Sequence, residues 1–132
     1  MIKRVVLIVF LGLLYNPFCA IAQDSIAIAE DVEEKKLVKF QEYFFKALSD
    51  KSIKNYRKSI ESLEACNEIL SENISVYFEL SKNYLLLNKT REAKIYIDKA
   101  LNIESSNIWM LQHSVTIQKK ERNYKEAIKT QL

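Results

Sequence analysis

Glycine, proline, histidine and cysteine are scarce in this chain of 132 residues. It contains one glycine, one proline, one histidine and two cysteines: Gly12, Pro17, His113, Cys19 and Cys66. A phosphate-cradling glycine loop therefore has no place after residue 12. Strand-rich folds use glycine and proline in their turns, so the scarcity favours an all-α chain whose helix–helix turns use asparagine.

The same scarcity argues against catalysis and metal binding. Both need several His, Cys, Asp or Glu side chains that converge on one point. Acidic pairs such as Glu33-Glu34 and Glu61-Glu64 lie near lysines, which is typical of a solvated helix face. His113 is interpreted as an ordinary surface or groove residue, and Cys66 as a small buried apolar residue. We expect no enzyme, no cofactor and no metal.

Residues 1–22 have the organisation of a signal peptide. Charged MIKR precedes the apolar run VVLIVFLGLLY, and Ala20-Ile21-Ala22 supplies small residues before a predicted cleavage site. An uncleaved membrane anchor is one alternative, although the run is short for a bilayer. A lipidated Cys19 is another, although Asn16-Pro17-Phe18 lacks the small residues expected there. Cleavage predicts export to a bacterial periplasm or the cell surface, with no membrane span afterwards.

Cleavage would also make the chain nearly neutral. The formal charge falls from 20 − 17 = +3 to 18 − 17 = +1, because Lys3 and Arg4 are removed. We therefore predict no nucleic-acid partner. Cys66 would be the remaining cysteine and could form no internal disulfide. Residues 23–36 are acidic and show little apolar periodicity, which predicts a solvated arm before a helical domain over 37–132.

A period of 34 residues runs through this domain. It relates three residues at the same place in similar segments (90 − 56 = 124 − 90 = 34): Tyr56, Thr90 and Tyr124. It also relates three small residues: Ser59, Ala93 and Ala127. Such a period indicates a helical repeat. We place the units near 40–73, 74–107 and 108–132, the last incomplete and without a capping helix.

The middle unit shows two helical stripes on either side of a polar turn, LNKTRE at 87–92. The first stripe has spacings of 3, 1 and 3: Tyr77, Leu80, Ser81 and Tyr84. The second has spacings of 4, 3 and 1: Ala93, Ile97, Ala100 and Leu101. These spacings predict a helix, a short turn and an antiparallel helix.

The middle unit resembles a tetratricopeptide repeat, whose pattern is aromatic-x2-Leu-small-x2-Tyr, then Ala-x3-large and a small residue. In the third unit NYKEAI (123–128) resembles the family's turn and second-helix opening. Five positions depart from the pattern: Lys46, Asp50, Ser71, Ser105 and Gln118. The resemblance implies an all-α, short right-handed solenoid of antiparallel helix pairs, in which small residues mark where two helices approach closely.

The resemblance also implies a binding surface, because the family's first helices line the concave face of the solenoid. Eight residues are candidates for contact with a partner: Phe44, Lys51, Phe78, Lys82, Leu85, Trp109, Gln112 and Lys119. Aromatic side chains would anchor a peptide and lysines would hold its carboxylates. As alternatives, Phe44 and Phe78 are inter-repeat core, and Trp109 is an end-of-groove or capping contact.

The two-carboxylate clamp of some family members is not expected here. Its columns carry other residue types: Phe44, Leu48, Glu79, Trp109 and His113. We predict a protein–protein interaction adaptor or scaffold with a protein or peptide partner. The alternative is a structural spacer at the front of a longer protein whose effector domain lies beyond Leu132. A peptidoglycan- or glycan-processing enzyme would need catalytic residues that this stretch lacks. The identity of the partner and the oligomeric state do not follow from the sequence.

Overall fold

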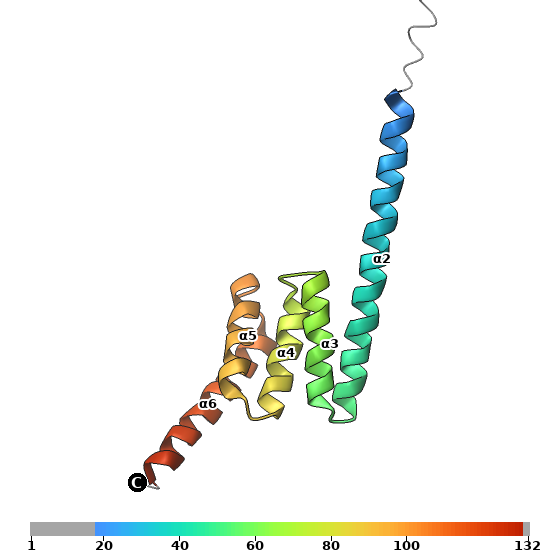
Figure 1. Ribbon diagram of the computed structural model, residues 1–132. Helices are drawn as coiled ribbons and strands as arrows, with labels where there is room; N and C mark the ends of the chain where they lie inside the picture. The colour runs from blue at the N-terminus through green and yellow to red at the C-terminus, as the bar shows by residue number, and fades with distance from the viewer. Residues whose placement is uncertain (1–17, 131–132) are drawn as a thin grey trace, which may run out of the picture. The chain divides into compact units, whose positions relative to one another are not determined.

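The computed structural model describes residues 18–130, with side chains over 31–123. The described part is all-α, as predicted, and contains no strand (Figure 1). Its five helices are α2 (Phe18–Ser52), α3 (Tyr56–Ile69), α4 (Ile74–Leu86), α5 (Thr90–Ile103) and α6 (Ile108–Thr130). Most of the predicted signal peptide, residues 1–17, lies outside the described residues.

Helix α2 begins earlier than the sequence predicts. We expected a solvated arm over 23–36 and a helix from near Leu37, whereas α2 starts at Phe18. Alanine, glutamate and lysine are strong helix formers in this segment, and intrahelical ion pairs support it, Lys35–Asp31 at 2.6 Å and Lys36–Glu33 at 2.8 Å. Residues 31–39 are all exposed, which agrees with a solvated segment over 31–36, and the backbone there is helical.

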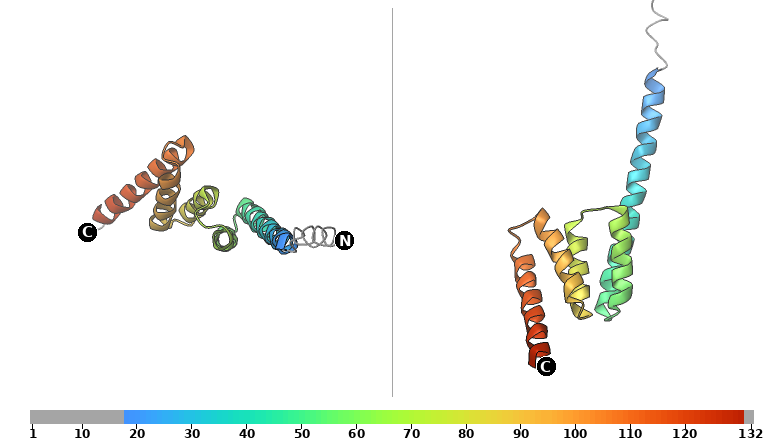
Figure 2. Two further views of the ribbon diagram at one scale, coloured as in Figure 1. Left: turned by 90° about the horizontal axis from the view of Figure 1, so that it is seen from above. Right: turned by 60° about the vertical axis from the view of Figure 1, so that its left-hand side comes forward.

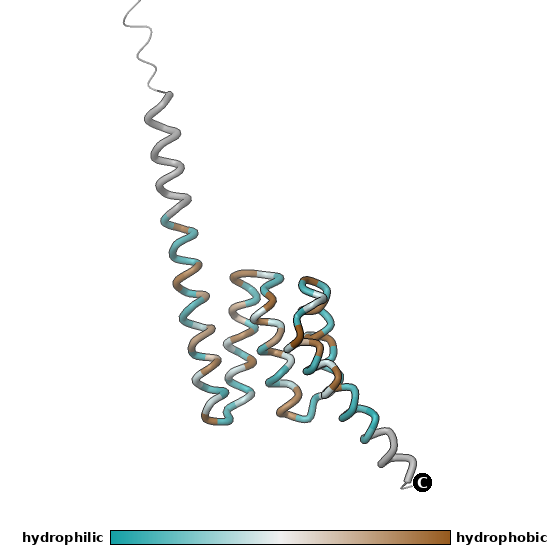
Figure 3. Tube along the Cα trace, turned by 180° about the vertical axis from the view of Figure 1, so that it is seen from behind, coloured by the Kyte–Doolittle hydropathy of each residue, from teal (hydrophilic) through white to brown (hydrophobic). Residues whose placement is uncertain are grey.

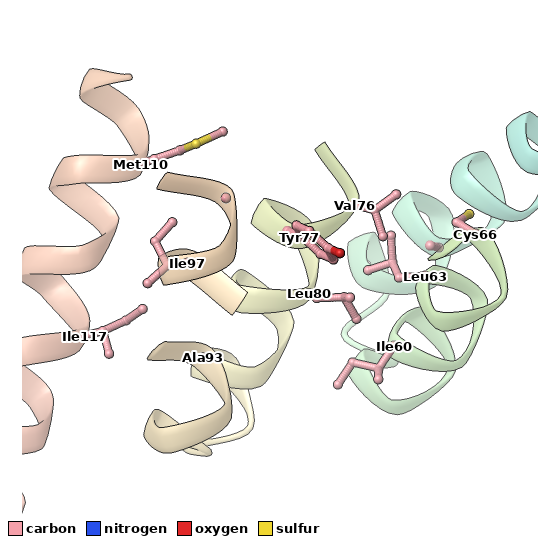
Figure 4. Packing of buried hydrophobic residues seen from close by; sticks show 12 residues of the cluster. Ile60, Leu63, Cys66, Val76, Tyr77, Leu80, Ala93, Ile97, Met110 and Ile117 are labelled. Carbon is pink, nitrogen blue, oxygen red and sulfur yellow. The ribbon is translucent and has the colours of Figure 1, made fainter. Parts of the chain in front are cut away.

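The chain divides into two compact units between Leu37 and Val38. In the second compact unit, residues 38–132, the helices α3, α4 and α5 lie side by side in chain order (Figures 1 and 2). Hydrophobic positions recur along each of its helices, as amphipathic helices require (Figure 3). Their buried members form one core cluster that includes residues of every helix (Figure 4): Ala47, Ile60, Leu63, Cys66, Val76, Tyr77, Leu80, Ala93, Ile97, Ala100, Met110 and Ile117.

The middle unit is the predicted helix pair, formed by α4 and α5. Six of the eight residues in the two predicted stripes are buried, Tyr84 and Leu101 are half-buried, and the small residue Ala93 is 0% exposed. The Ser81 hydroxyl donates a buried hydrogen bond of 2.7 Å to the Ala93 carbonyl, which brings the α4 side chain onto the α5 backbone. A larger side chain at either position would hold the two helices apart.

The turns inside the first two units repeat each other at the 34-residue period. Lys54 and Asn88 have left-handed φ values of 63° and 61°. In each turn this residue's N–H donates to the carbonyl three positions earlier, at 3.0 Å, and the next N–H donates to the carbonyl five positions earlier, at 2.8 and 2.9 Å. Asparagine fills this position at Asn88 as predicted. In the first turn Lys54 takes it, and Asn55 precedes α3 instead.

The first helices of units two and three begin at equivalent asparagine caps. The Asn73 Oδ1 accepts from the N–H groups of Ser75 and Val76, at 3.0 and 3.1 Å. Asn107, 34 positions later, accepts from the two equivalent N–H groups of α6, at 3.2 and 3.4 Å. Each cap satisfies N–H groups that have no partner inside the helix, so the unit begins at a defined residue without the family's proline.

The third unit differs from the predicted helix pair. Helix α6 is continuous from Ile108 to Thr130, so the turn expected at NYKEAI is absent and Asn123 lies within the helix. Figures 1 and 2 show α6 running on beyond the turn that joins α4 and α5. Glu121 and Arg122 favour helix, and Arg122 stands where the middle unit has Asn88. The 34-residue register is therefore kept in sequence but not in backbone conformation.

Candidate functional site

The first helices of the three repeats, α2, α4 and α6, contribute to one surface of the compact unit formed by residues 38–132. We call this surface the first-helix face. A group of charged and aromatic side chains at its centre joins these three helices. We call this group the Glu79 cluster, and its members are Lys51, Phe78, Glu79, Lys82 and His113.

Two lysines of the Glu79 cluster share one carboxylate. Lys51 Nζ lies 2.7 Å from one Glu79 oxygen, which links α2 to α4, and Lys82 Nζ donates to the other oxygen. The Glu79 side chain is 14% exposed, and those of Lys51 and Lys82 are 26% and 28% exposed. The three groups carry a net charge of +1 in a partly desolvated place, where charges interact more strongly than on an open surface.

Burial acts on the ionisation of these groups in opposite ways. Burial alone would raise the pKa of Glu79, but the hydrogen bonds and positive charges of Lys51 and Lys82 outweigh it, so the pKa is lowered. Burial lowers the pKa of Lys82, and Glu79 offsets this only in part. The carboxyl of Glu79 is therefore ionised at neutral pH.

Aromatic rings form one side of the cluster. Lys82 Nζ lies 4.4 Å from the centre of the Phe78 ring, a cation–π contact. The His113 ring meets Phe78 edge-on, with centroids 5.6 Å apart and an angle of 83°. Phe78 is thus held between a cation and an imidazole from the next unit.

The tautomer of neutral His113 follows from its hydrogen bond. Its Nε2 lies 3.0 Å from the Ser81 Oγ. Ser81 has already given its single hydroxyl hydrogen to the Ala93 carbonyl, so the hydroxyl accepts and Nε2 donates. The lone pair of the neutral ring is therefore on Nδ1. Burial lowers the pKa of His113, which favours this neutral form.

Three of the eight predicted contact residues, Lys51, Phe78 and Lys82, are brought together in the Glu79 cluster. The prediction missed Glu79, which was considered only as a departure from the family's clamp. Its spacing from Lys82, three positions on one helix, was a usable signal for a pair. Lys51 is 28 positions from Glu79 in the sequence, so no local spacing could predict their contact.

The other predicted residues lie in different surroundings. Phe44 and Leu85 are, like Phe78, half-buried against the core, and Phe44 stacks on Phe40 of the same helix at 5.9 Å. Trp109 is 70% exposed. Gln112 and Lys119 are exposed on α6, beside an open hollow of about 550 Å³ that is lined by residues of this helix alone.

A second aromatic group joins α3, α4 and α5. Tyr84 and Tyr96 stack at 5.5 Å, and Tyr77 is 6.1 Å from Tyr96. The Tyr84 hydroxyl donates to Glu64 at 3.2 Å, and burial together with the Glu64 charge raises the pKa of Tyr84 to about 12. Lys99 lies over two of the rings, Tyr77 and Tyr96. These contacts hold the three helices together, and each tyrosine ring contacts another ring and a lysine.

Three further observations concern metal ligands, helix hydropathy and the thiol of Cys66. Within it, no group of three or more His, Cys, Asp or Glu side chains is placed to hold a metal ion. Between residues 18 and 130, no helix is long and apolar enough to cross a membrane. Cys66 is buried, as predicted, and burial raises its pKa to about 11, so the thiol stays protonated at neutral pH.

Comparisons with known proteins agree with the predicted repeat type of the middle unit. Residues 74–107 match the family model described as tetratricopeptide repeat, in the register given by the sequence. A stretch of 75 residues is 33% identical to sperm-associated antigen 1 from Rattus norvegicus. This stretch is 57% of the chain and only 8% of that relative. The middle unit is thus a repeat of tetratricopeptide type, and the all-α fold around it is consistent with a solenoid of such helix pairs.

Proposed function

We propose that this chain is a protein-interaction adaptor whose first-helix face binds an acidic segment of a partner protein. The observation that supports this most is the Glu79 cluster, where two lysines share one carboxylate and keep a surplus positive charge beside Phe78. An incoming carboxylate would meet two ammonium groups in partly desolvated positions, and charge-assisted hydrogen bonds are stronger there than in water.

The chemistry of the cluster favours an acidic ligand over a basic one. Both Glu79 oxygens already accept from lysines, so a basic ligand would have to displace them. Each ammonium group has three hydrogens and uses one on Glu79, which leaves donors for a ligand. Phe78 adds an apolar surface for the hydrocarbon part of a neighbouring side chain.

A direct test uses two dye-labelled peptides, one rich in glutamate with a single aromatic residue, the other with every glutamate replaced by lysine. Fluorescence anisotropy should show binding of the acidic peptide alone. Lys82→Gln should weaken it about tenfold, the loss of one charge-assisted contact. Glu79→Gln should strengthen it, because both lysines are released.

The opposite signs separate binding from support of the fold. If the cluster only holds helices together, both variants should lower the stability of the fold. Their effects on peptide affinity should then not have opposite signs. The matched control is Lys58→Gln, an exposed lysine on α3 with no ion pair among those described, which should leave binding unchanged. Equal affinity of the unaltered chain and Lys82→Gln would contradict the proposal.

The proposal includes export to a bacterial periplasm or the cell surface. Support comes from the sequence of residues 1–22, which has the charged start, apolar run and small-residue exit of a signal peptide. The measurement is the intact mass of the native polypeptide in cell fractions. A species beginning at Gln23 in the exported fraction agrees with it, whereas a species that keeps Met1 contradicts cleavage. A much heavier species would favour the spacer alternative.

A further inference from the structure

His113 lies at the contact between the second and third repeats, inside the Glu79 cluster. Its ring packs edge-on against Phe78, and its Nε2 lies 3.0 Å from the Ser81 Oγ, so both contacts join α6 to α4. Histidine is the side chain whose ordinary pKa places its change of charge between pH 5 and 8. The chain contains one histidine, so a histidine titration can be assigned to this ring.

The hydrogen bond to Ser81 allows His113 to gain a proton without losing a contact. In the neutral ring Nε2 donates to the Ser81 hydroxyl, and the unprotonated nitrogen is Nδ1. A proton from solvent is therefore added at Nδ1, while Nε2 keeps its hydrogen and its bond to Ser81. The bond from Ser81 to the Ala93 carbonyl is also kept, so the packing of α4 on α5 does not change. The ring can thus change its charge by +1 and stay in place.

Charged groups of two helices, α2 and α4, face His113. Burial is the largest influence on the ring and lowers its pKa, and the hydrogen bond to Ser81 offsets this in part. Lys82 on α4 and Lys51 on α2 also lower the pKa of His113, whereas Glu79 on α4 raises it. Burial and the two lysines prevail, so the ring is neutral at neutral pH while no ligand is bound.

A carboxylate bound at the Glu79 cluster would add a negative charge near this ring. Lys82 Nζ and the His113 ring both contact Phe78, at 4.4 and 5.6 Å from its centre, so they are no further apart than the sum of these distances, about 10 Å. The Debye length at physiological salt is about 8 Å, and partly buried charges are screened less than exposed ones. A ligand carboxylate on Lys82 therefore offsets the positive charge that opposes protonation of His113.

We infer that the first-helix face binds acidic ligands more tightly as the pH falls, because His113 takes up a proton when they bind. This regulation rests on the proposed function, since it needs an acidic ligand at the Glu79 cluster. Linkage makes the effect reciprocal: a ligand that favours the protonated ring is bound more tightly by the protonated ring. Affinity is constant above the pKa of His113 in the complex. It rises as the pH falls from that value to the lower pKa of the free protein.

Fluorescence anisotropy of the full chain with the dye-labelled glutamate peptide, at pH 7.5 and 5.5, tests this inference. The unaltered chain should bind the peptide about three- to tenfold more tightly at pH 5.5, as expected for one added charge near a partly desolvated carboxylate. His113→Gln is the matched control, because its amide can donate to Ser81 but takes up no proton. The pH dependence that remains in this variant belongs to the peptide's own carboxylates. An equal pH dependence in the two proteins would overturn the inference.

Nuclear magnetic resonance of the single imidazole provides a measurement that needs no variant. The midpoint of the His113 titration should move to higher pH when the acidic peptide is saturating, by the logarithm of the fold-change in affinity. An unmoved midpoint with the peptide bound would overturn the inference and leave the proposed function intact. Failure of the acidic peptide to bind at any pH would overturn the proposed function, and this regulation with it.

Discussion

The middle and third units bury equivalent positions of their first helices to different extents. Tyr77 and Ser81 of α4 are 7% and 0% exposed, whereas Leu111 and Val115, 34 positions later in α6, are 44% and 47% exposed. Both helices begin at an asparagine cap and pack against the preceding unit. They differ at the turn that follows, present after α4 and replaced by helix in α6. The apolar residues on one side of a helix show what that helix can bury. The turn that follows determines whether the next helix of the same chain covers them.

The largest test of this comparison substitutes one leucine in each unit. Leu80→Ala should lower the free energy of unfolding by about 2–5 kcal/mol, because it leaves a cavity among fully buried neighbours. Leu111→Ala should cost about 1 kcal/mol or less, since nearly half of that side chain already faces solvent. Urea unfolding of dilute protein, followed by circular dichroism, measures both. A similar cost would mean that α6 is covered within the monomer.

A second test exchanges the residues at one repeat position. Ser81→Val gives the middle unit the residue of the third, adds bulk where α4 meets α5, and removes the hydrogen bonds with Ala93 and His113. It should cost about 1–3 kcal/mol. The reverse change, Val115→Ser, should stay within about 0.5 kcal/mol in the monomer. Equal effects would show that close helix approach does not constrain the middle unit.

The sequence was sufficient for the parts of the fold that depend on repeated spacing. Residues 34 apart share roles in the structure: Ser59 and Ala93 are both fully buried, and Asn73 and Asn107 cap first helices. It was insufficient where one helix continues in place of a turn. In α2 and α6 the local content of helix formers prevailed over the expected arm and turn, because helix propensity adds up residue by residue while a repeat register does not.

The site was predictable only where its contacts are local. Glu79 and Lys82 are three positions apart on one helix, and this spacing predicts an ion pair from sequence. The Lys51 contact and the His113 contact with Phe78 cross between units. They depend on how far each helix is displaced along its neighbour, which side-chain volumes in the core determine. The lysines were therefore expected as free cations, whereas Glu79 already pairs with both of them.

The helix caps provide a smaller test of the same comparison. Asn73→Ala should cost about 1 kcal/mol, because two backbone N–H groups at the start of α4 lose their acceptor. Asn107→Ala should cost less, since its two hydrogen bonds are longer and α6 is covered on one side only. Thermal unfolding of both variants gives the ranking. A larger loss at Asn107 would contradict this ranking.

The smallest effect concerns the left-handed position of each turn. Lys54 adopts a φ of 63°, which costs a residue with a Cβ about 1–2 kcal/mol, while glycine loses more backbone entropy on folding. The net result of Lys54→Gly should be a gain of about 0.5 kcal/mol, and Asn88→Gly should gain less because asparagine tolerates this geometry. Arg122→Gly has no strain to relieve, because Arg122 is helical, so it should lower the helicity of α6 at 222 nm. Three substitutions at one repeat position thus differ in direction according to whether the turn is formed. A stabilised, equally helical Arg122→Gly protein would show that the third unit already turns as the first two do.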